Sequence, residues 1–121
     1  MIINEKEYKF MLTAGAAVEL AKICPDEDIR KYGDLLTDNV IENIGVVNKL
    51  AVILSKGYAD AERCFGRNAD QISEEMMMSL PFYKYIDLQN ELQQTIRRDI
   101  VGTVETKPVK GSKKAETEAE A

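Results

Sequence analysis

The sequence contains no histidine and no tryptophan among its 121 residues. Histidine is the usual general base and the commonest metal ligand at neutral pH, so its absence excludes Ser-His-Asp and Cys-His catalysis within this chain and argues against a zinc site. The chain also lacks a glycine-rich nucleotide loop, an HExxH pattern and an EF-hand loop. We therefore expect no enzymatic activity, no cofactor and no metal.

Cysteine and long apolar runs are also scarce. Cys24 and Cys64 stand forty positions apart, form neither a CxxC motif nor a disulfide framework, and lie among apolar residues, so we interpret both as small buried thiols. The first twelve residues lack the continuous apolar run of a signal peptide, and the densest apolar stretch, 44–54, is far shorter than the ~18 residues that a bilayer span needs. These features predict a cytoplasmic protein without a membrane partner.

The charge balance is acidic, with 16 lysines and arginines against 21 aspartates and glutamates and a net charge of −5. An acidic domain gains no counterion-release free energy on a phosphate backbone, so general nucleic-acid binding is disfavoured. Hydrophobic residues make up 45% of the chain, which is enough for a packed core, and 121 residues correspond to one domain.

An alternating pattern opens the chain. Within residues 1–12, the apolar Tyr8, Phe10 and Leu12 are separated by single residues, which is typical of a half-buried strand. Together with the turn-forming residues at 4–6, this pattern predicts a short β-hairpin. A lone hairpin is only marginally stable in water, so we expect its apolar face to pack against helices.

Helical periodicity and capping residues dominate the rest of the chain. The stripe from Ile41 to Phe65, spaced by three and four residues, indicates a central helix of about 26 residues, in which Gly45 and Gly57 are candidates for a close helix crossing or a bend. The expected helices are 14–24 capped by Thr13, a short helix 26–32 ended by Gly33, 40–65 capped by Asn39, a short helix after Ser73, and a last helix from Pro81 to Gly102.

The predicted fold is therefore mainly α: a helical domain with a small N-terminal β-hairpin over residues 1–101, followed by a flexible charged tail over 102–121. The tail segment has few apolar residues and no periodicity, and a lysine-rich part precedes a glutamate-rich end. These features are typical of an unstructured segment.

Three consecutive methionines, Met76, Met77 and Met78, are the most informative local feature. Successive helical residues turn by about 100°, so all three cannot face one core. One interpretation is two core side chains and one half-exposed side chain. The other is part of a hydrophobic surface that binds a partner or a second copy, together with Phe82 and Tyr85.

The order of these segments resembles the tail assembly chaperones of long-tailed phages and prophages of Gram-positive bacteria. The likeness rests on IINEKEYKF at 2–10, ISEE at 72–75, LPF at 80–82 and the amphipathic helix that follows. In that family the hairpin turn often carries Asn-Gly, whereas Glu5 follows Asn4 here. The resemblance transfers no catalytic residue, because the family has none.

The resemblance implies a non-enzymatic protein of the host bacterial cytoplasm that binds the tape-measure protein, or another tail protein, during tail assembly. The runner-up hypothesis is a small helical adaptor or regulatory protein of a bacterial or phage system, self-associating through the methionines and residues 82–85. A small hydrolase or metal enzyme is the weakest of the three hypotheses. A tape-measure gene downstream would favour the chaperone, and a stand-alone gene beside a promoter would favour the regulator.

Overall fold

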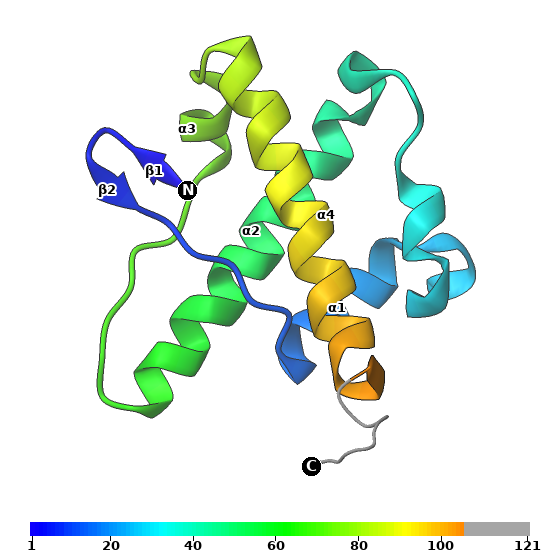
Figure 1. The fold of residues 1–121 in the computed structure, drawn as a ribbon, viewed down its shortest axis with the longest axis horizontal. Coiled ribbons are helices and arrows are strands. Elements are labelled where there is room, and N and C mark those ends of the chain that lie inside the picture. Colours follow the sequence, from blue (N-terminus) through cyan, green and yellow to red (C-terminus); the bar gives the residue numbers. More distant parts are fainter. Residues whose placement is uncertain (106–121) are drawn as a thin grey trace.

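The computed structural model describes residues 1–105 of the chain. These residues contain two short strands, four α-helices and two 3₁₀ segments, joined by loops (Figure 1). Side chains are described as far as residue 100. The mainly helical fold with an N-terminal hairpin confirms the predicted fold class. The elements are β1 (Ile2–Ile3), β2 (Lys6–Glu7), α1 (Ala14–Ile23), η1 (Pro25–Glu27), η2 (Ile29–Leu35), α2 (Val40–Cys64), α3 (Glu74–Met78) and α4 (Phe82–Glu105), where η denotes a 3₁₀ segment.

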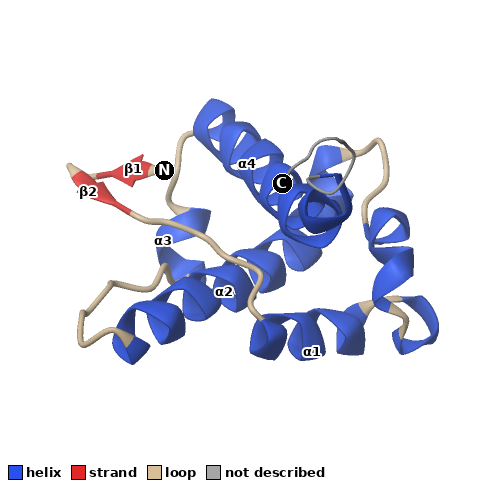
Figure 2. Cartoon of the chain, turned by 60° about the horizontal axis from the view of Figure 1, so that its bottom comes forward, coloured by secondary structure: helices blue, strands red, loops and turns tan. Residues whose placement is uncertain are grey.

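Helix α2 is the centre of the fold, and α1, α3 and α4 all contact it. In the view of Figure 2, α4 lies above α2 and α1 lies below it. The 25 residues of α2 match the predicted length. Val47, Leu50, Ala51 and Leu54 are buried at the predicted spacing of three and four, because they face the helices that cover α2.

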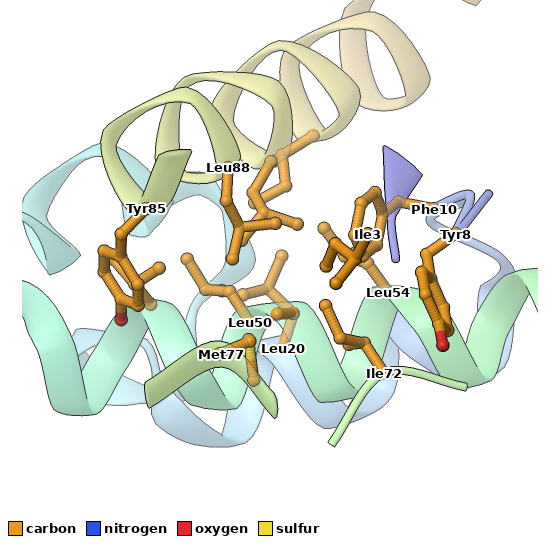
Figure 3. Close-up of a cluster of buried hydrophobic side chains, with 14 of the residues drawn as sticks. Ile3, Tyr8, Phe10, Leu20, Leu50, Leu54, Ile72, Met77, Tyr85 and Leu88 are labelled. Carbon is orange, nitrogen blue, oxygen red and sulfur yellow. The ribbon is translucent and has the colours of Figure 1, made fainter. Parts of the chain in front are cut away.

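Every helix and the hairpin contribute to one hydrophobic core (Figure 3). The hairpin and the segment after it supply Ile3, Tyr8 and Phe10, which confirms the alternating burial that the sequence predicts. The remaining side chains labelled in the figure are Leu20, Leu50, Leu54, Ile72, Met77, Tyr85 and Leu88. The fold therefore depends on long-range contacts between its two ends.

An extended segment, residues 8–13, carries the chain from the hairpin to α1. The Met11 N–H donates to the Leu54 carbonyl at 3.1 Å, and the Leu12 N–H donates to Asp99 Oδ2 at 2.8 Å. The segment therefore connects α2 to α4 through its backbone, which leaves it little freedom to move independently of the two helices.

The three predicted capping residues are confirmed. Thr13, Asn39 and Ser73 each accept a hydrogen bond from a backbone N–H in the first turn of the helix that follows. Because these N–H groups have no partner within the helix, each cap contributes about 1 kcal/mol and fixes where its helix begins.

The hairpin turn contains two residues with left-handed backbone. Ile3 pairs with Lys6, and the two residues between them, Asn4 and Glu5, have φ values of 53° and 65°. Two consecutive positive φ values define the type I′ turn that joins tight hairpins. Asparagine tolerates this region, but glutamate is strained there, so Glu5 stores unfavourable backbone energy.

We predict that Glu5→Gly raises the free energy of unfolding by about 0.5–1 kcal/mol, because glycine adopts the left-handed region without steric cost. Urea unfolding followed by circular dichroism measures this difference. Asn4→Gly is the matched control and should change stability less, because asparagine already tolerates the turn. A lower stability of Glu5→Gly would contradict the assigned turn.

Only one of the two glycines in α2 marks a close crossing. A Cβ atom added at Gly57 would lie 2.4 Å from the Met11 carbonyl oxygen and 3.1 Å from the Ala16 Cβ, so the predicted close approach occurs there. At Gly45, an added Cβ would meet no heavy atom within 4 Å. The packing of the described residues therefore explains why position 57 is a glycine, but it gives no reason for a glycine at position 45.

The predicted short helix over 26–32 is wrong. Asp26 and Glu27 have left-handed φ values of 57° and 54°, so an α-helix cannot start there, and two 3₁₀ segments replace it. The second segment continues through Gly33 to Leu35. Local carboxylate contacts favour this path, since Asp28 Oδ1 accepts hydrogen bonds from both the N–H and the Nε of Arg30 at 3.0 Å.

The predicted end of the last helix is also corrected. Helix α4 continues past Gly102 to Glu105, so the first residues of the predicted tail, 102–121, are helical. Residues 106–121, which hold the rest of that prediction, lie outside the described part of the chain. Within residues 1–105, no helix is both long and apolar enough to cross a membrane.

Candidate protein-binding surface

The structure divides the five predicted partner-binding residues into three groups: buried, partly buried and exposed. Met77 is 0% exposed and Tyr85 is 4% exposed, so neither can contact a partner without unfolding, and both are removed from the predicted surface. Met76 is partly buried against the core. Met78 and Phe82 remain on the surface, with 57% and 53% of their area exposed.

Helix geometry explains this division. In α3, a rotation of about 100° per residue places Met77 in the core and Met78 on the outside. In α4, Tyr85 begins the buried row, which continues through Leu88, whereas Phe82 lies one turn earlier, where the core no longer covers the helix. The 3.6-residue periodicity of α4 therefore predicts the burial of Tyr85 correctly. It predicts burial of Phe82 wrongly, because Phe82 lies beyond the end of the core.

One neighbouring aromatic residue was missed by the sequence analysis. Tyr83 is 65% exposed although it is large and apolar. It lies outside the stripe of apolar residues on α4, so periodicity predicts no role for it. We define the junction patch as Met78, Phe82 and Tyr83, three exposed side chains within six residues where α3 meets α4.

A partly buried polar cluster contacts one member of the junction patch, Met78. The amide nitrogen Nδ2 of Asn48 lies 3.1 Å from Glu74 Oε2 and 3.4 Å from the Met78 sulfur. The Tyr85 hydroxyl donates to Asn48 Oδ1 at 2.6 Å. These contacts join α2, α3 and α4 at one point, so the position of Met78 is fixed by side chains of all three helices.

Burial raises the pKa of the Tyr85 hydroxyl to about 12, and the nearby negative charge of Glu74 adds to the effect. The hydroxyl therefore stays protonated at neutral pH and acts as a hydrogen-bond donor to Asn48. Because the folded pKa exceeds the ordinary value of 10, this site favours the folded state below pH 10 and loses that contribution as the pH rises towards 12.

A groove runs between α1 and α2 beside this cluster. It consists of two adjoining hollows of about 520 and 530 Å³, which share Glu19, Val52 and Ile53. Asn48 and Glu74 line one hollow, so the groove begins where the polar cluster holds Met78. We call this the α1–α2 groove. The other lining residues are Gly15, Ala16, Lys22, Ile23, Gly45, Lys49, Lys56, Gly57 and Asp60.

Charged residues stand on both walls of the α1–α2 groove. Lys22 pairs with Glu19 at 3.1 Å on α1, and Lys56 pairs with Asp60 at 2.8 Å on α2. Lys49 has no ion-pair partner among the described side chains. Exposed pairs within one helix contribute only about 0.3–0.5 kcal/mol, so these side chains can exchange partners when another molecule approaches.

The potential metal ligands among the described side chains are dispersed, and the two cysteines differ in burial. Within residues 1–100, no group of three or more cysteine, aspartate or glutamate residues lies close enough together to hold a metal ion. Burial raises the pKa of the Cys24 thiol, and the charge of Asp28 adds to this shift. Cys64 is exposed at the end of α2, which corrects the interpretation of both cysteines as buried thiols.

Comparison of the chain with protein-family models, with curated proteins and with solved structures finds no match. The candidate surface must therefore be judged from its own geometry. It combines exposed apolar side chains with an adjoining groove, and this arrangement is suited to binding another polypeptide.

Proposed function

We propose that this protein binds an apolar helical segment of another protein and shields it from water, in the manner of a phage tail assembly chaperone. The observation that supports this most is the junction patch, where three large apolar side chains are between 53% and 65% exposed within six residues. Exposed apolar side chains that are grouped together mark interaction sites, whereas those that occur singly are common on protein surfaces.

A tape-measure protein is the client that the family resemblance implies. A long helix with apolar stripes aggregates when its stripes are exposed, so a protein that covers them keeps the helix available for assembly. The net charge of −5 would help to keep the loaded complex in solution. The proposed setting is the cytoplasm of the host bacterium, where tails are assembled.

The main rival is a small adaptor that self-associates through the same patch. Both hypotheses use Met78 and Phe82, but they differ in the partner that covers these residues. Sedimentation equilibrium of the protein alone separates them. A monomer that forms a complex only with a tape-measure fragment supports the chaperone, whereas a stable dimer without affinity for the fragment supports the adaptor.

We predict that Met78→Asp and Phe82→Asp each reduce binding of a helical tape-measure fragment from the same genome at least tenfold. Each change places a negative charge on the surface that we propose makes apolar contact with the client. Each side chain is exposed enough for the fold to tolerate the substitution. Isothermal titration calorimetry measures the binding, and circular dichroism confirms that each variant is folded.

Phe65→Asp is the matched control. Phe65 is 73% exposed, but it caps the far end of α2, seventeen residues beyond Asn48. Because α2 rises about 1.5 Å per residue, roughly 25 Å separates the two positions. The control variant should therefore bind like the unmodified protein. Equal losses in all three variants, or no loss in any, would contradict the proposed role of the junction patch.

A further inference from the structure

We infer that Met78 is a reversible oxidation site, at which a peroxide converts the thioether to a sulfoxide and thereby weakens binding of the client at the junction patch. This inference rests on the proposed function and adds a means of regulation to the same surface. It is carried by the unequal burial of the three consecutive methionines and by the contact between the Met78 sulfur and Asn48.

The fold protects the methionines of the chain unequally. Met77 is 0% exposed in the core, Met76 is partly buried against it, and Met78 is 57% exposed (Figure 3 shows Met77). The other two methionines, Met1 and Met11, are partly buried as well. A peroxide oxidises a methionine only where it can reach the sulfur, so exposure governs the rate. We therefore expect Met78 to react first.

The reaction needs only the thioether of the protein and a peroxide. A sulfur lone pair attacks one oxygen of hydrogen peroxide, and the S–O bond forms as the O–O bond breaks. The departing hydroxide takes the proton of the transferred oxygen and becomes water. The sulfur is oxidised by two electrons and the peroxide is reduced by two. Methionine sulfoxide reductases reverse this change, so the modification can act as a switch.

The contact with Asn48 determines which side of the Met78 sulfur is open to the peroxide. Asn48 is 3% exposed, and its Nδ2 lies 3.4 Å from the sulfur. The amide is held in place, because Nδ2 also donates to Glu74 Oε2 at 3.1 Å and Oδ1 accepts from the Tyr85 hydroxyl at 2.6 Å. The N–H group covers one of the two sulfur lone pairs. Oxygen is therefore added at the other lone pair, which gives a single sulfoxide epimer.

This direction of attack changes the junction patch and spares the fold. The added oxygen lies on the side of the sulfur that faces away from the buried Asn48 amide, in the patch that Met78 shares with Phe82 and Tyr83. A client with an apolar face would have to cover this strongly polar group, which opposes binding. The inner contact with Asn48 remains in place. Oxidation of Met77, in contrast, would disrupt the core.

Limited treatment of the full chain with hydrogen peroxide, followed by tandem mass spectrometry, tests the site. Met78 should be oxidised at least about tenfold faster than Met77. Each of the two classes of methionine sulfoxide reductase accepts one epimer, and only one class should reduce most of the product at position 78. The chain oxidised in concentrated urea is the matched control. It should give both epimers there, because unfolding removes the Asn48 contact.

Isothermal titration calorimetry with the tape-measure fragment tests the effect on binding. Oxidation should reduce the affinity about fivefold or more, and reduction should restore it. Met78→Leu is the matched control, because leucine keeps an apolar side chain without a sulfur. This variant should bind the fragment equally well before and after peroxide treatment. Cys64 is exposed and also reacts with peroxide, but the variant retains it, so any effect of its oxidation appears in the control.

Three results would overturn the inference: oxidation of Met76 or Met77 as fast as that of Met78, equal amounts of the two epimers in the folded protein, or an unchanged affinity after Met78 is oxidised. If Phe82→Asp abolishes binding of the fragment while oxidation has no effect, the chaperone role stands and this regulation does not exist. If the unmodified protein does not bind the fragment at all, the proposed function fails, and the regulation fails with it.

Discussion

Replacing Met77 with aspartate is expected to unfold the protein, whereas the same replacement at Met78 is expected to leave it folded. Met77 is 0% exposed in the centre of the core, and Met78 is 57% exposed. A carboxylate at position 77 would lose its hydration without gaining a partner and would leave unfilled space. This combination costs about 4 kcal/mol or more, which is a large part of the stability of a small domain.

Urea unfolding followed by circular dichroism measures both variants under the same conditions. Met78→Asp should change the free energy of unfolding by less than about 1 kcal/mol, apart from the contact of the Met78 sulfur with Asn48. Because both variants carry the same new charge, the comparison separates burial from charge. Similar stabilities would mean that the assignment of one methionine to the core and one to the surface is wrong.

Gly57→Ala is expected to lower the free energy of unfolding by about 1–3 kcal/mol, although alanine is the better helix former by about 1 kcal/mol. The added methyl group would lie 2.4 Å from the Met11 carbonyl oxygen, which belongs to the backbone and cannot rotate away. The hydrogen bond from the Met11 N–H to the Leu54 carbonyl would have to shift with it.

Gly45→Ala is the matched comparison in the same helix. Nothing lies within 4 Å of the added atom, so only the gain in helix propensity remains, and the variant should be more stable by about 1 kcal/mol. Thermal unfolding followed at 222 nm gives both differences. If Gly57→Ala is as stable as Gly45→Ala, the close contact between α2 and the extended segment does not exist in solution.

Local sequence signals were sufficient to predict where α1, α2 and α3 begin. Thr13, Asn39 and Ser73 are side chains that complete a helix start on their own, so their role does not depend on the rest of the fold. The helical periodicity of α2 was also clear in the sequence, because a helix covered on several sides carries a long apolar stripe. The hairpin followed from the turn residues at 4–6, but its second strand, Lys6–Glu7, ends before the alternating Tyr8 and Phe10, which are buried in the extended segment and not in a strand.

Structural features that depend on tertiary contacts could not be predicted from the sequence. Residues 25–35 carry only a short apolar period, Ile29, Tyr32 and Leu35. Their path depends on left-handed backbone at Asp26 and Glu27 and on local carboxylate contacts. The burial of Tyr85 and the exposure of Phe82 differ only because the core ends between them. Periodicity identifies a helix face but does not show where its neighbours end.

The α1–α2 groove could not be predicted for the same reason. Its walls come from segments that are about thirty residues apart in the sequence, and neither wall is unusual when considered alone. Gly45 was recognised as a candidate crossing point, but only the structure distinguishes it from Gly57, because the distinction depends on what lies opposite each glycine. The junction patch was found in part, through Met78 and Phe82.

Hydrogen exchange of the protein with and without a tape-measure fragment tests the central claim most directly. Binding should slow amide exchange in α3 and in the first turns of α4, and should leave the end of α2 near Phe65 unchanged. Slower exchange confined to other regions, or no change at saturating fragment, would contradict the claim that this protein works by covering an apolar helix of another chain.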